Sequence, residues 1–127
     1  MNPLTLEWVE KAEGDFITAT REFRARKAPN YDAACFHAQQ MAEKYLKAVL
    51  QEHAYAIPKT HSLVDLMALC MKIDPSYQMV QADLNILEGF SVQFRYPGQS
   101  ADKLDAKSAL NAARVVRTFF RTRLGLP

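Results

Sequence analysis

Apolar residues recur every three or four positions through most of the chain, a spacing that predicts amphipathic helices. Between residues 6 and 26, one helical face would carry Trp8, Phe16, Ala19 and Phe23. The same spacing predicts long helices over residues 31–53 and over residues 101–124. No segment shows the strict alternation of a half-buried strand, so the pattern indicates an all-α protein.

Capping and turn residues divide the rest of the chain. Ser62 is a suitable N-cap for a short helix over residues 62–72. Asp74-Pro75 predicts the start of a fourth helix, which we expect to extend to Phe94 and to bury Met79 and Ile86. Short connections between such helices favour an antiparallel up-and-down bundle of four to five helices. We expect one domain over residues 1–127.

The helix predicted over residues 31–53 has a broad apolar face and an opposite polar face with Lys44 and Lys47. Two large apolar residues, Phe36 and Leu50, fall on that polar side. Because exposed apolar groups on a polar face can mark a partner surface, we expect Phe36 and Leu50 to lie at a protein interface. In the last helix, Leu104 and Val115 are expected to face inward.

Composition adds limits rather than an activity. The 127 residues are 49% hydrophobic and 24% charged, with a net charge of +2, which is typical of a soluble globular protein. No apolar run approaches the ~20 residues that span a bilayer, and no signal peptide is evident, so we expect a cytoplasmic protein. Cys35 and Cys70 lack CxxC spacing and are interpreted as a reduced, buried pair rather than a disulfide or metal site.

Three motifs occur in a fixed order: CFHAQQMAEKYLKAVL at residues 35–50, PKTHSL at residues 58–63 and FRYP at residues 94–97. This arrangement resembles the HEPN domain family over most of the chain. The resemblance implies a helical bundle that usually forms homodimers. It also implies a possible minimal nucleotidyltransferase partner in a toxin–antitoxin-like system, and a nucleotide-binding role.

Arg95 is the first candidate site residue. Many HEPN ribonucleases carry a histidine four to six residues after the motif arginine, but residues 96–102 here contain none. Ser100 and Asp102 stand near that place, and Asp102 is better explained as charge at the start of a helix. An arginine fork suits a phosphate, while the alternative is a structural arginine that bonds helix-end carbonyls.

His61 and His37 are the candidates to replace the absent histidine. His61 lies in the loop before the third helix, where a plain loop or capping role is the alternative. Lys44, Lys47, His61, Arg95 and Tyr96 form the expected ligand-binding set, and the Tyr96 hydroxyl is a possible nucleotidylation target of a transferase. The scattered histidines predict no metal site, and we expect no cofactor.

Five basic residues share an arc of the last helix: Lys103, Lys107, Arg114, Arg117 and Arg121. Such a stripe can neutralise RNA phosphates or contact an acidic partner, and its plain alternative is a solvated face.

The sequence therefore supports three hypotheses. The first is a nucleotide- or RNA-binding or regulatory subunit with a minimal nucleotidyltransferase partner. The second is a metal-independent endoribonuclease toxin that uses Arg95 and a non-standard histidine. The third is a helical interaction module without a ligand.

Overall fold

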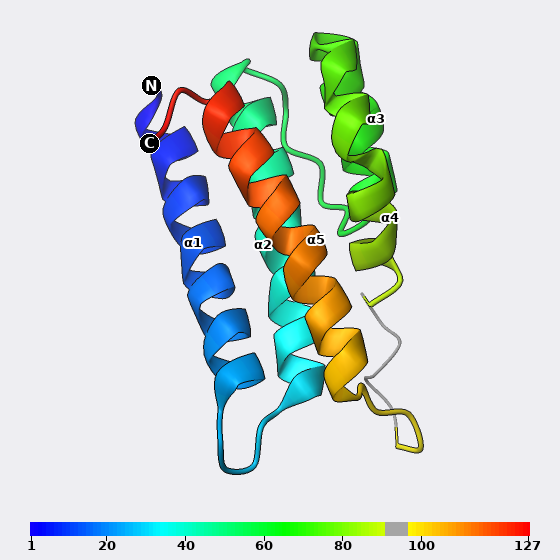
Figure 1. The fold of residues 1–127 in the computed structure, drawn as a ribbon. Coiled ribbons are helices and arrows are strands. Elements are labelled where there is room, and N and C mark those ends of the chain that lie inside the picture. The colour runs from blue at the N-terminus through cyan, green and yellow to red at the C-terminus, as the bar shows by residue number, and fades with distance from the viewer. Residues whose placement is uncertain (91–96) are drawn as a thin grey trace.

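The computed structural model describes residues 1–90 and 97–127, which form five α-helices and one 3-10 helix (Figure 1). No strand occurs among these residues, so the predicted all-α class is confirmed. In chain order the elements are α1 (Pro3–Arg24), α2 (Tyr31–Glu52), α3 (Leu63–Ile73), η1 (Pro75–Val80), α4 (Gln81–Glu88) and α5 (Lys103–Arg123).

Helix α2 lies at the centre of the bundle. Helices α1 and α5 pack along it, and α3 and α4 cover it on a further side (Figure 1). Most of its 22 residues are buried, and Leu46, Val49 and Leu50 have no exposed surface at all. Full burial of one such side chain contributes about 1.5–3 kcal/mol, so this helix supplies much of the core.

The burial of Leu50 corrects the sequence-based expectation that it lies at a protein interface. A helical wheel placed it among polar residues, but other parts of the same chain cover that side of α2. Phe36 is half-buried, and its ring meets the His37 ring edge-on at 5.3 Å between centroids.

The direction of the helices departs from a simple up-and-down order at one connection. The Cys70 thiol lies 3.7 Å from the Leu46 carbonyl oxygen, and the Gln39 side chain reaches the His61 carbonyl. The earlier residue of one segment contacts the earlier residue of the other, and the later contacts the later, so α2 and α3 run in parallel. The chain achieves this by running back along α2 between residues 53 and 62 (Figure 1).

The predicted fourth helix begins as expected but has a different form. The Asp74 side chain caps it by accepting from the Ser76 backbone N–H, and Pro75 follows. The first turns are the 3-10 helix η1, and α4 ends at Glu88, with Gly89 as its C-cap, instead of continuing to Phe94. Phe94 itself lies outside the described residues.

Four residues expected to be buried are exposed instead: Met79 (73%), Ile86 (42%), Leu104 (74%) and Val115 (48%). For Met79 the reason is the 3-10 geometry, because three residues per turn place a side chain on a different face from 3.6 residues per turn. Tyr77 and Val80 of η1 point to the core in its place, and the Tyr77 ring stacks on Phe120 at 5.4 Å.

Helix α5 begins with a complete capping box. Asp102 accepts from the Asp105 backbone N–H at 2.8 Å, and Asp105 accepts from the Asp102 backbone N–H at 3.0 Å. Asp102 is thus the N-cap, a structural role like the one expected for it.

Replacing Asp102 with alanine is expected to lower the free energy of unfolding by about 1 kcal/mol, since the helix loses one capping acceptor. Urea unfolding of wild type and D102A measures the difference. Lys103→Ala, an exposed neighbour, is the matched control, and an Asp102→Ala loss no larger than the control would contradict the capping role.

Candidate functional site

A row of polar side chains follows one side of α2: His37, Gln40, Glu43, Lys44 and Lys47. At 3.6 residues per turn these positions fall within one third of the helix circumference. We call this row the α2 seam. The seam contacts α1 at Asp15 and Trp8, and it contacts the connection between α2 and α3, residues 53–62, at His61.

The first cluster of the seam surrounds Asp15, which α1 holds on its mostly apolar inner face. One carboxylate oxygen of Asp15 lies 2.8 Å from Nδ1 of His37, and the other accepts from Nζ of Lys44. The Asp15 side chain is only 10% exposed, while that of His37 is 30% exposed. An ionised carboxylate only accepts, so Nδ1 is the donor and the Nε2 atom of a neutral His37 is left as an acceptor.

The second cluster surrounds Glu43, whose side chain is 5% exposed. Lys47 donates to it at 3.1 Å, and its ammonium group also lies 5.7 Å from the centre of the Trp8 ring. His61 approaches from the connection, with Nδ1 at 3.1 Å from the carboxylate. This second imidazole is largely in solvent, so the cluster joins a buried ion pair to an exposed titratable group.

Two glutamines hold the connection against the seam. Gln40 donates from Nε2 to Oε1 of Gln39 at 2.8 Å, and Gln39 donates to the backbone carbonyl of His61 at 3.3 Å. The position of His61 therefore depends on α2 through both its ring and its backbone.

The remaining titratable groups do not add an obvious reactive centre. Burial raises the pKa of the Cys35 and Cys70 thiols to about 12, so both stay protonated and unreactive at neutral pH. Both thiols are free and buried, as the sequence predicts. In the part of the chain that the structure describes, no three potential metal ligands gather. Nor is any helix there long and apolar enough to cross a membrane.

Comparison with known proteins gives the same family that the motifs suggested. The HEPN domain model matches residues 5–123, nearly the whole chain. This protein belongs to the HEPN domain family. No curated protein matches the sequence.

Two solved structures share the HEPN fold of this chain. One is TT1696 from Thermus thermophilus, at 23% identity and a TM-score of 0.74, with 93% of this chain and 96% of that chain covered. The other is ST0689, an archaeal HEPN homologue, at 22% identity and a TM-score of 0.67, with 94% and 96% covered. At these identities the likeness establishes the fold alone.

The HEPN motif residues and the α2 seam are largely the same residues. Gln39, Gln40, Glu43 and Lys44, which carry the resemblance in the sequence, form the polar network on α2, and His61 of the second motif joins it. The structure thus brings together Lys44, Lys47 and His61 from the expected ligand-binding set. Each of the three contacts a carboxylate. Arg95 and Tyr96 lie outside the described residues.

Sequence reasoning missed Asp15 and Glu43 as the centres of the two clusters. Asp15 was detectable, because it shares a helical face with Ala12 and Ala19, and an acid on an apolar face signals a buried polar contact. The burial of Glu43 was not detectable, although the residue lies within the first motif, because the helical pattern placed it on the polar side of residues 31–53.

The expected basic stripe of α5 is only partly available in the HEPN fold. Arg117 forms a two-pronged contact with Glu13 of α1, with Nη2 2.6 Å from Oε1, and Arg121 contacts the Pro127 carbonyl and the Tyr45 hydroxyl. Lys103, Lys107 and Arg114 remain exposed. Two of the five cations are therefore structural, and the stripe is shorter than the sequence implied.

Proposed function

We propose that this HEPN protein is a cytoplasmic, single-domain binding or regulatory subunit. It forms a homodimer with Phe36 near the contact, binds a nucleotide or RNA phosphate, and works with a minimal nucleotidyltransferase in a toxin–antitoxin-like system. The ligand site would combine Arg95 with the exposed parts of the α2 seam, with Tyr96 beside Arg95 as a possible nucleotidylation target.

The observation that supports this proposal is the coincidence of the family motif with the seam. Two lysines and two histidines gather there around two buried carboxylates. The two lysines and the two carboxylates pair one to one, so their charges cancel. In this proposal Arg95 supplies the net positive charge that a phosphate requires.

Lys44 is the seam cation best placed to reach a ligand, because its side chain is 23% exposed whereas that of Lys47 is 8% exposed. Lys44→Ala and Arg95→Ala are each expected to weaken binding of a fluorescent oligoribonucleotide or ATP analogue by roughly tenfold, through loss of one charge-assisted contact. Fluorescence anisotropy at fixed ionic strength measures this. Lys72→Ala on α3 is the exposed control. The proposal fails if wild type binds neither probe, or if all three variants bind equally.

One observation favours the ribonuclease alternative. The Asp15–His37 contact of 2.8 Å orients a histidine that is partly exposed, as an acid–base catalyst requires. If this protein cleaves RNA, labelled RNA incubated without metal should be cut by wild type and Lys72→Ala. It should not be cut by His37→Gln or Arg95→Ala. Cleavage that survives His37→Gln but not His61→Gln would assign the acid–base role to His61. If wild type does not cleave RNA, the ribonuclease alternative is excluded and the binding-subunit proposal stands.

A further inference from the structure

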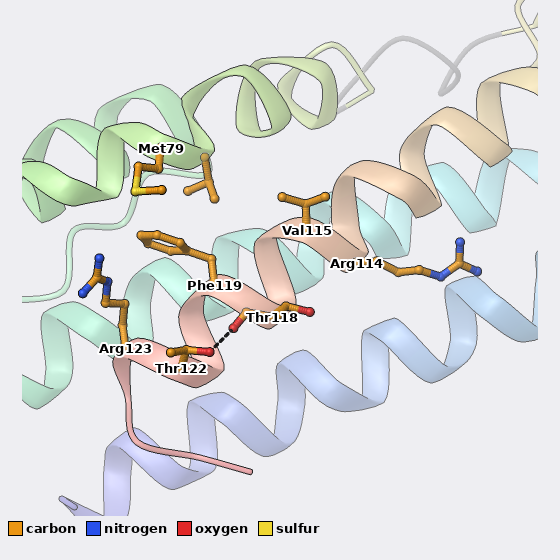
Figure 2. A pocket seen from close by; sticks show the side chains of 8 residues that line it. Met79, Arg114, Val115, Thr118, Phe119, Thr122 and Arg123 are labelled. Carbon is orange, nitrogen blue, oxygen red and sulfur yellow. Dashed lines mark hydrogen bonds between the residues drawn. The ribbon is translucent and has the colours of Figure 1, made fainter.

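An open groove runs between η1 and α5, on a different part of the molecule from the α2 seam (Figure 2). Its volume is about 670 Å³, and its apolar lining comes from Met79 and Val80 of η1 and from Val115 and Phe119 of α5. Met79 is 73% exposed and Val115 is 48% exposed. Large apolar side chains gathered at one exposed place are unusual for a globular domain and mark a contact surface.

Arginines stand at the two ends of this groove. Arg123 lies over the Phe119 ring, 5.0 Å from its centre (Figure 2). Arg114 donates to the Asn111 side chain at 3.1 Å. Neither forms an ion pair with a carboxylate in the described parts of the chain, and no acidic residue lines the groove. Asp74, the N-cap of η1, interacts with Arg123 at longer range. Nine residues separate Arg114 from Arg123 along α5, which corresponds to about 14 Å along the helix axis and to half a turn around it, so the two arginines flank the exposed apolar stripe of α5 from opposite sides.

We propose that the η1–α5 groove docks an acidic amphipathic helix of a partner protein. The apolar face of that helix covers Met79 and Val115, and carboxylates on the two flanks of that face meet Arg114 and Arg123. A groove between two packed helices is the usual seat for a third helix, whose anchors recur at i, i+3, i+4 and i+7. This inference does not depend on the nucleotide or RNA site.

Charge decides between this occupant and a second copy of the chain. A two-fold contact through this face would bring Arg114 and Arg123 of one copy toward the same arginines of the other. With no acidic residue in the groove lining, such a contact would place like charges together, which opposes association. An acidic helix relieves that repulsion and covers the same apolar lining.

Selection of a displayed library of randomised helical peptides on the immobilised full chain tests the proposal. Enriched peptides should carry an apolar stripe flanked by Asp or Glu. A purified, labelled peptide from that pool should bind Met79→Glu roughly tenfold or more weakly than wild type, and Arg114→Glu/Arg123→Glu similarly weakly. Ile17→Glu on α1 is the matched control, because Ile17 is also apolar and 56% exposed, and it should bind as wild type does.

Several outcomes would overturn the proposal. These are a failure to enrich any peptide, enrichment of peptides without acidic residues, or binding that survives Met79→Glu. A dimer in analytical ultracentrifugation that Met79→Glu converts to monomer would assign the groove to a second copy instead. Far-UV circular dichroism should be unchanged in Met79→Glu, since this side chain contributes little to the core.

Discussion

Replacing Glu43 with alanine is expected to lower the free energy of unfolding by about 3 kcal/mol, the largest effect we predict for a single polar side chain. The substitution leaves the Lys47 ammonium group, whose side chain is 8% exposed, without its carboxylate. An unpaired buried charge costs far more than a lost surface ion pair. Chemical denaturation measures the change, and the melting temperature should fall by about 10 °C.

The double variant Glu43→Met/Lys47→Met is the matched control for this prediction. It removes both charges and fills the same space with flexible apolar side chains, so we expect a stability within about 1–2 kcal/mol of wild type. The double variant should therefore be more stable than Glu43→Ala. If the free energy of unfolding decreases equally in the two variants, the unpaired ammonium group is not the cause, and the loss comes from changed packing around positions 43 and 47.

The second large effect is expected at Glu13, which joins three helices. Its carboxylate accepts from Arg117 of α5 and from the hydroxyl of Tyr45 of α2, and Tyr45 is completely buried. Glu13→Gln keeps the shape but weakens the contacts of both donors, so the free energy of unfolding should fall by about 2 kcal/mol. Thermal unfolding should show a decrease of about 7 °C. Glu10→Gln, an exposed carboxylate on the same helix, should change little.

The Glu13→Gln loss should depend on pH in a defined direction. Burial alone would raise the pKa of Glu13, but the hydrogen bonds from Arg117 and Tyr45 outweigh it, and the pKa lies below its ordinary value of 4.5. A carboxyl whose pKa is lower in the folded state than in the unfolded state stabilises the fold fully at a pH above its unfolded-state pKa. It loses that contribution as the pH falls through its folded-state pKa. The gap between wild type and Glu13→Gln should therefore be full near pH 7 and should narrow below about pH 4.5. A gap that stays constant to about pH 3 would contradict this.

Local signals in the sequence predicted the helices well. Ser62 and Asp74 each cap a helix through a side-chain oxygen, as their positions indicated, and Asn30 caps α2 in the same way. Capping depends on neighbours within three residues, so a single sequence contains the necessary information. The start of α5 at its capping box was predictable for the same reason.

The surroundings of each helix were harder to predict, because they depend on distant parts of the chain. The polar side of α2 was expected to face solvent, yet Glu43, Lys47 and Leu50 are buried there. The return of residues 53–62 along α2 and the approach of α1 cause this, and neither is visible in the periodicity of residues 31–53. In η1 the helix type itself changed, which moved Met79 to the surface and created the groove.

The location of the HEPN motif inside the polar seam has a consequence for experiments in living cells. A cell degrades proteins that spend more time unfolded, and a loss of about 1–2 kcal/mol can change abundance several-fold. An alanine at Glu43 or Asp15 would therefore silence any phenotype of this protein by removing the protein itself. Substitutions at exposed positions such as His61 leave the core intact. A phenotype that such a substitution changes therefore reports lost activity rather than lost protein. Growth assays on motif variants thus report activity only where the steady-state protein level is measured beside them.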